Sequence, residues 1–223
     1  MQLYIGNKNY SSWSLRPWLL MAHLGLPFEE VKLRLAYDAG SAFKKALATV
    51  TPAGRVPVLV DEGFAVWDTL AIAEYLAEKY PARHLWPAQP LVRARARSLC
   101  AEMHSGFSAL RNHCPMNIEA SMPEVGARLL REKPEVVRDL ERIAGMWEAQ
   151  FDAHSGGPFL FGDFSIADAF YAPVCTRIKT YGLPMPARAA AYVQRIHDLP
   201  AMQDWVRDAL AEHDFLADGE PYR

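Results

Sequence analysis

The spacing of apolar residues changes once along the chain, near residue 80, and this change most limits the possible folds. In the first eighty residues, strand patterns with period 2 alternate with helical patterns of period 3.6. The predicted order is strand, helix, strand, helix, strand, strand, helix, over residues 3–5, 15–22, 31–35, 42–48, 58–60, 65–67 and 69–80. This order, with its last two strands as a hairpin, predicts a small mixed sheet with helices on both faces.

Two segments show the basis of this assignment. Apolar residues from Leu15 to Ala22 recur at i, i+3, i+4 and i+7, and Pro17 is expected in the first turn, where a missing amide is tolerated. Residues from Val31 to Leu35 alternate between apolar and basic, which predicts a strand with one solvated face.

Beyond residue 90 the pattern is helical almost without interruption. An apolar stripe from Val137 to Phe151 predicts one long helix. A further helix is predicted to open at Ser165, with Asp168 completing a capping box. Residues 81–90 contain three prolines and are expected to form a linker between a domain at 1–80 and an all-helical domain at 91–223.

Composition argues against several kinds of partner. The chain is 51% apolar and 22% charged, values typical of folded domains, and its formal charge of -2 gives no electrostatic reason to expect nucleic acid or a membrane surface. No leader or membrane-spanning run is recognised, so a cytoplasmic location is expected. Cys100, Cys114 and Cys175 lack metal-ligand spacing and are expected to be buried free thiols, with no metal site.

Ser11 and Ser12 stand between the first predicted strand and the first helix. A hydroxyl there lies beside the amides and the positive dipole of a helix N-terminus, a place that favours an anion. Lowering a thiol pKa of roughly 8.5 by two units takes about 2.7 kcal/mol, and one hydrogen bond to a charged acceptor contributes about 1.5 to 3 kcal/mol. Either serine is therefore a candidate for activating a thiol. The alternative is that both merely cap the helix.

Two further motifs are candidates for binding. Arg55, Val56 and Pro57 precede the third strand, and a cis bond before the proline would expose the Val56 backbone to an extended peptide. The alternative is an ordinary trans proline opening a strand. Asp68 and Thr69 begin the next helix, where they could receive a ligand's ammonium and carboxylate, or Asp68 could act only as an N-cap.

Together these motifs resemble the glutathione transferase superfamily, over essentially the whole chain. The segment SSWSLRPWLLMAHLG resembles the serine-containing segment of the zeta class, although Trp13 stands where that class has cysteine and Pro17 where it has an aliphatic residue. The resemblance implies a thioredoxin-like domain followed by an all-helical domain, with glutathione as cosubstrate. It also implies that Ser11 activates the glutathione sulfur, with Ser12 as the alternative. The glutathione-binding residues it implies are Arg55, Val56, Pro57, Asp68 and Thr69, where Asp68-Thr69 replaces the commoner Glu-Ser.

A second substrate is expected between the domains. Met103, His104, Phe107 and Arg111 recur at helical spacing, and Trp13 is expected to face them from the first helix. The alternative is that these residues are a core-packing stripe. Arg111 is a candidate for binding a substrate carboxylate, although a surface ion pair would explain it as simply.

The expected function is a glutathione transferase that uses the thiolate on a small electrophile. Two alternatives stay open at this point: a glutathione-dependent isomerase of the maleylacetoacetate type, and a ligand-binding module without catalysis. The resemblance also implies a homodimer. In it, Trp67 would face the partner, and the basic strip Arg93, Arg95 and Arg97 would meet acidic residues such as Glu62, Asp68 or Glu74 across the axis.

Overall fold

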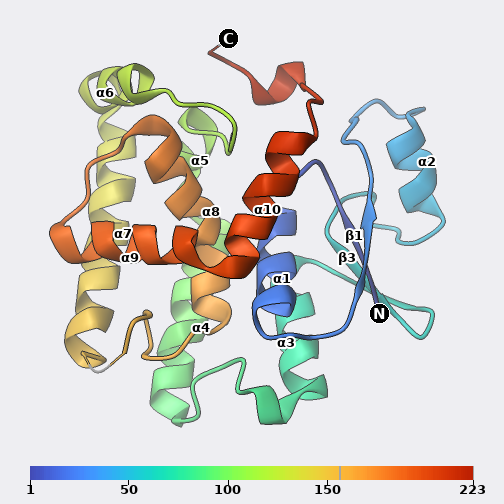
Figure 1. Cartoon of the computed structure of the whole chain (residues 1–223), viewed down its shortest axis with the longest axis horizontal. Helices are drawn as coiled ribbons and strands as arrows, with labels where there is room; N and C mark the ends of the chain where they lie inside the picture. The colour runs from blue at the N-terminus through green and yellow to red at the C-terminus, as the bar shows by residue number, and fades with distance from the viewer. Residues whose placement is uncertain (156, 223) are drawn as a thin grey trace.

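The computed structural model describes residues 1–155 and 157–222. Its N-terminal part contains a four-stranded sheet in the order β2-β1-β3-β4 (Figure 1). The strands are β1 (Gln2–Ile5), β2 (Glu29–Lys32), β3 (Val58–Asp61) and β4 (Phe64–Trp67). β1 is parallel to β2 and antiparallel to β3, and β3 and β4 form an antiparallel hairpin. The mixed sheet predicted from the sequence is therefore confirmed.

Three helices cover this sheet: α1 (Ser12–His23), α2 (Ala42–Ala48) and α3 (Thr69–Lys79). Successive strand residues point to opposite faces, so β1, β3 and β4 each contribute to two apolar clusters. Leu3 and Leu59 belong to the large core that includes α1 and α3, whereas Val58 packs in a smaller cluster with Phe43 and Leu47 of α2. The predicted arrangement of helices on both faces is confirmed.

Two local predictions are wrong. The second strand ends at Lys32, not Leu35, because β1 has only four residues, and the Leu35 amide is taken by the Asn7 side chain at 2.8 Å instead of by a neighbouring strand. Pro17 does not lie in the first turn of its helix, because α1 already begins at Ser12. Pro17 is therefore the sixth helical residue, within the interior of α1.

The C-terminal part is helical, as predicted. Its elements are η1 (Pro81–Arg83), α4 (Pro90–Ser105), α5 (Ser108–His113), α6 (Pro123–Glu132), α7 (Pro134–Ala153), α8 (Ile166–Tyr181), α9 (Ala187–Asp198), α10 (Pro200–Ala211) and η2 (Ala217–Gly219). The predicted stripe from Val137 to Phe151 lies on α7, a helix of 20 residues. An α/β thioredoxin-like part followed by an all-helical part is thus the observed fold class.

Helix α8 joins the two parts, because it packs against α1 on one side and against α4, α6 and α9 on others (Figure 1). All of its residues except Lys179 are buried. The capping box predicted at its start is confirmed: the Asp168 carboxylate accepts hydrogen bonds from the Ser165 amide at 2.9 Å and from the Ser165 hydroxyl at 3.2 Å. The same carboxylate also accepts from the Leu160 amide at 3.1 Å and the Tyr192 hydroxyl at 2.9 Å.

All three cysteines are free and buried, as predicted. Among residues 1–155 and 157–222, no cluster of three or more His, Cys, Asp or Glu side chains could hold a metal ion. Over the same residues, no helix is both long enough and apolar enough to cross a bilayer.

Candidate active site

A cavity of about 860 Å³ lies where the loop after β1 meets the C-terminal end of the chain. It is lined by residues 10–13, 34–38, 43–44, 54–56, 115–116 and 215–219. The predicted thiol-activating serines and the predicted peptide-binding turn therefore border one space, although more than forty residues separate them in sequence. Its far wall comes from the last residues of the chain.

Ser11 is the N-cap residue of α1, but its side chain makes no capping hydrogen bond. Instead its hydroxyl shares a 2.7 Å hydrogen bond with the hydroxyl of Ser14, and Ser14 Oγ accepts from the Gly6 amide at 3.1 Å. The cap interpretation of Ser11 is thus not supported by its side-chain contacts. Ser11 lies at the cavity wall, at the end of a short hydrogen-bonded chain.

Ser12 has different surroundings, because a guanidinium lies beside it. Arg177 Nη2 donates to Ser12 Oγ at 3.3 Å, and the rest of that guanidinium donates to the carbonyls of Cys114 and Pro173. Burial and the nearby Arg111 charge lower the pKa of Arg177 to about 10. A cationic group is therefore held at the start of α1, at the edge of the cavity.

Two more arginines surround Trp13. The guanidinium of Arg16 lies 4.2 Å from the Trp13 ring centroid, and that of Arg111 lies 4.8 Å from it. Arg16 is 3% exposed, and burial, followed by the charges of Arg177 and Arg111, lowers its pKa to about 9. Within the part of the chain that the structure describes, Arg16 Nε and Nη1 have no hydrogen-bond partner. This region therefore carries a surplus of positive charge.

The predicted cis bond between Val56 and Pro57 is confirmed. Arg55 and Val56 line the cavity, and Pro57 is buried behind them. Lys44 also lines the cavity, and its ammonium donates to the Gly54 carbonyl at 2.8 Å. Backbone groups and two cationic side chains thus border this side of the cavity.

Asp68 and Thr69 begin α3, as predicted. Asp68 has a φ of 75°, and its Oδ1 accepts from the Leu70 amide at 2.8 Å, so the N-cap interpretation is confirmed. Its other oxygen lies 3.3 Å from His104 Nε2. Thr69 is 1% exposed, and its hydroxyl has no hydrogen-bond partner among residues 1–155 and 157–222. Neither Asp68 nor Thr69 is among the residues that line the cavity.

The predicted second-substrate residues are only partly where the sequence placed them. Trp13 lines the cavity, and its ring centroid lies 5.1 Å from that of His104, as expected. Met103 and Phe107 are buried core residues, so the alternative interpretation holds for them. His104 and Arg111 do not line the cavity either, and Arg111 donates to the His104 carbonyl at 3.2 Å. The part of the chain beyond residue 90 contributes residues 115–116 and 215–219 to the cavity lining instead.

Several groups at the site were not predicted from the sequence, among them Ser14, Lys44, Arg177 and residues 215–219. A usable signal existed for Arg177, since a cation inside an apolar helical run is seldom fully buried without a partner. Ser14 offers no such signal, because serine is common near helix starts. The position of residues 215–219 depends on contacts with residues some two hundred positions earlier, which no local pattern reveals.

Comparison with known proteins gives matches over most of the chain. Residues 10–79 match the family described as glutathione S-transferase, N-terminal domain, and residues 117–217 match its C-terminal domain. A maleylacetoacetate isomerase of Pseudomonas aeruginosa is 29% identical over 94% of this chain and 95% of its own. A probable maleylacetoacetate isomerase of Caenorhabditis elegans is 29% identical over 82% of this chain and 81% of its own. The crystal structure of a glutathione transferase homologue from Burkholderia with bound glutathione superposes with a TM-score of 0.69. It is 27% identical and covers 95% of this chain and 98% of its own.

Proposed function

The chain belongs to the glutathione S-transferase superfamily, and from this premise we propose that it binds glutathione and uses its thiolate on a small electrophile. The observation that carries the proposal is the position of Ser11 at the wall of the cavity, where its hydroxyl is hydrogen-bonded to the Ser14 hydroxyl and not to a backbone amide of α1. We further propose that residues 1–80 bind glutathione, that residues 91–223 contribute to the second-substrate site, and that residues 81–90 link them.

Ser11 can stabilise a thiolate because Ser14 can donate a hydrogen bond to the Ser11 oxygen, which leaves the Ser11 O–H free to donate to the sulfur. Either hydroxyl of the pair can be the donor, and Ser14 already accepts from the Gly6 amide. When Ser14 donates to Ser11, the Ser11 proton is available for a sulfur anion in the cavity. A hydrogen bond of this kind to a charged acceptor contributes about 1.5 to 3 kcal/mol, enough to bring a thiol of pKa roughly 8.5 close to neutrality.

Other residues fit the remaining parts of glutathione. The Val56 backbone, beside the cis bond, borders the cavity and can pair with an extended peptide. The Thr69 hydroxyl can donate to a carboxylate at the start of α3. Asp68 has one carboxylate oxygen outside the helix cap, which can accept from an ammonium group. Arg55 and Lys44 can attract the anionic ends of the tripeptide.

The cations around Trp13 support an anionic electrophile. Arg16, Arg111 and Arg177 form no ion pair with any carboxylate in the described parts of the chain. A buried surplus of positive charge is costly unless an anion compensates it. A substrate carboxylate near Ser12 would offset that cost, in addition to the thiolate.

Replacing Arg177 by methionine should raise the KM for a carboxylated electrophile by about tenfold or more, because a charge-assisted contact is lost. Turnover of a neutral aryl halide should change little. Steady-state kinetics with a matched pair of electrophiles, one with and one without a carboxylate, would measure this. Arg177→Lys, which keeps the charge, should retain part of the preference, and a thermal melt of each variant checks folding. Equal losses with both electrophiles would contradict an anionic substrate.

A second candidate function is a glutathione-dependent isomerase of the maleylacetoacetate type. The 29% identity to the Pseudomonas aeruginosa isomerase, over nearly the full length of both chains, favours it, as does the arginine cluster. An isomerase would return glutathione unchanged, whereas a transferase consumes it. Ser11 would have the same role in both, since each reaction begins with attack by the thiolate.

Two assays test the proposed function. Retention on immobilised glutathione, with elution by free glutathione, tests binding. Consumption of glutathione with a generic aryl halide separates a transferase from an isomerase and from a binding module without catalysis. A protein that is not retained and shows no saturable binding in solution would contradict the proposal.

We also propose a homodimer that uses the outer edge of the sheet. Phe64 and Trp67 of the edge strand β4 are 68% and 44% exposed, an unusual exposure for large apolar side chains. One predicted contact needs correction: Glu74 is bound within its own chain by Arg97, at 2.8 and 3.0 Å, so it is not free to meet the arginine strip of a partner.

Light scattering at micromolar concentration should report about twice the 25.0 kDa mass of the chain. Replacing Trp67 by glutamate should shift the mass toward that of one chain, because a charge at the centre of an apolar contact is costly to bury. Leu210→Glu on α10 is the matched control, because Leu210 is 43% exposed, close to the exposure of Trp67, and lies on another element. A wild-type mass of one chain throughout this range would exclude the dimer.

A further inference from the structure

The loop between β1 and α1 is polar in sequence but buried in the structure. Asn7, Lys8 and Asn9 are each at most 3% exposed. Ser11 follows two residues later, and its amide donates to the Asn7 carbonyl at 2.8 Å. Buried polar groups need partners, so the groups that pair with this loop determine where Ser11 lies.

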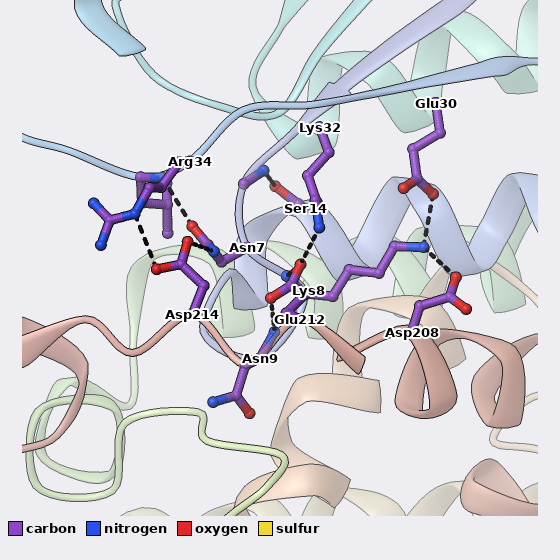
Figure 2. A network of polar contacts seen from close by, with 12 residues as sticks. Asn7, Lys8, Asn9, Ser14, Glu30, Lys32, Arg34, Asp208, Glu212 and Asp214 are labelled. Atoms are coloured by element: carbon purple, nitrogen blue, oxygen red, sulfur yellow. Dashed lines mark hydrogen bonds and ion pairs between the residues drawn. The ribbon is translucent and has the colours of Figure 1, made fainter. Parts of the chain in front are cut away.

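Glu212, just after the end of α10, provides two of these partners. Its Oε1 accepts from the Lys8 amide at 2.8 Å, and its Oε2 accepts from the Asn9 amide at 3.4 Å (Figure 2). The Glu212 side chain is 2% exposed, and Lys32 Nζ lies 3.2 Å from Oε1. Because each oxygen binds one amide, a single carboxylate fixes the direction of two consecutive peptide groups.

Further contacts from the C-terminal end hold the same loop. Asp208 accepts from Lys8 Nζ at 2.6 Å, and Asp214 accepts from Asn7 Nδ2 at 3.0 Å (Figure 2). In addition, Trp205 Nε1 donates to the Lys8 carbonyl at 3.0 Å. The Lys8 ammonium also lies 5.3 Å from the Trp205 ring centroid. Residues about two hundred positions away in sequence therefore fix the loop.

The geometry of the loop connects these contacts to Ser11. The amides of Tyr10 and Ser11 both donate to the Asn7 carbonyl, at 3.2 and 2.8 Å, so residues 7–11 form a closed turn. Lys8 and Asn9 both lie within that turn. A rotation of their peptide groups would displace the Ser11 hydroxyl from its place beside Ser14.

We propose that Glu212 is a positioning residue of this active site, which holds the Lys8 and Asn9 amides and thereby sets the place of the Ser11 hydroxyl. This rests on the proposed function, in which Ser11 activates the thiol. Glu212 itself need not touch glutathione. Its loss should therefore affect ionisation of the bound thiol more than it affects affinity for glutathione.

The test compares Glu212→Gln with the wild-type protein. Glutamine keeps the size of the side chain but replaces one acceptor oxygen with a donor that faces an amide. The rate at pH 6.5 should fall about tenfold to a hundredfold, as expected for a misplaced catalytic group, while the Kd for glutathione changes by less than about threefold. The pKa of the bound thiol, measured by titrating the ultraviolet absorbance of its thiolate, should rise by about one unit or more.

Asp204→Asn is the matched control, because it removes a carboxylate from α10 that pairs with Arg207 and does not contact the loop. It should leave the pH profile unchanged. Wild-type protein with no thiolate signal at neutral pH would contradict the proposed function. A normal wild-type signal together with an unchanged profile in Glu212→Gln would overturn the positioning role of Glu212.

A second measurement uses the unaltered protein and does not depend on the variant folding. If Glu212 holds the two amides, Lys8 and Asn9 should exchange their amide hydrogens about as slowly as the core helices do. Exchange of these two amides at the rate of an exposed loop would overturn the proposal.

Discussion

Replacing Asp168 by alanine should lower the free energy of unfolding by about 3 to 5 kcal/mol, the range expected when one partner of a buried charged network is removed. The carboxylate accepts hydrogen bonds from the Ser165 amide and hydroxyl, the Leu160 amide and the Tyr192 hydroxyl. Alanine leaves all of these donors buried without an acceptor, at a cost of about 1 to 3 kcal/mol for each one that water cannot reach. Because α8 joins the two parts of the molecule, the loss of stability should affect the unfolding of both parts.

Denaturant unfolding measures this difference in free energy. Two further variants show whether the effect is specific to the Asp168 carboxylate. Tyr192→Phe removes one of the donors together with its need for a partner, so it should cost only about 1 kcal/mol. Asp198→Ala removes an exposed carboxylate that accepts from Gln194, and its effect should stay within about 0.5 kcal/mol. A loss below about 1 kcal/mol in Asp168→Ala would show that the network does not hold the start of α8.

The stability contribution of Asp168 should depend on pH in a defined direction. Burial raises the pKa of Asp168 to about 6, whereas the unfolded value is about 3.9. An acid whose folded pKa is raised contributes its full stability below pH 4, and that stability declines as the pH rises through 6. The difference between wild type and Asp168→Ala should therefore be larger at pH 5 than at pH 8.

The sequence predicts the fold well because its signals are local. The short apolar run of β3, the stripe of α7 and the Ser165 to Asp168 cap are each recognisable from the residues of one element. The second strand fails for a physical reason: apolar alternation continues to Leu35, but the partner strand has turned away by then. The length of a strand is set by its neighbour as well as by its own residues.

The site is predictable only where its residues lie close together in sequence. Ser11 and Val56 belong to short motifs, and the structure places both at one cavity. The second-substrate wall is different, because helical spacing does not distinguish a pocket from a core, and Met103 and Phe107 are core residues. Arg177 reaches Ser12, and residues 215–219 reach the cavity, only through the packing of α8 and α10 against α1, which a local pattern does not encode.

Replacing Ser11 by alanine should lower kcat/KM at pH 6.5 by tenfold or more, because a hydrogen bond to the thiolate of about 1.4 kcal/mol or more is lost. Affinity for glutathione should fall only modestly, since most of the tripeptide would be held by other residues. The pH dependence gives the more specific test. Without Ser11 the bound thiol should ionise closer to its free pKa of roughly 8.5, so the rate deficit should narrow as the pH rises toward 9.

Variants of the neighbouring Ser14 and Ser12 test which hydroxyl activates the thiol. Ser14→Ala removes the group that can donate to Ser11, so it should shift the pH profile in the same direction but by less. Ser12→Ala removes an acceptor of Arg177 and should leave the thiol profile close to that of the wild type. If Ser12→Ala raises the thiol pKa and Ser11→Ala is silent, the activating group moves by one residue. That outcome would mean that the cation beside Ser12 determines the position of the thiolate, rather than the hydrogen-bonded chain through Ser14.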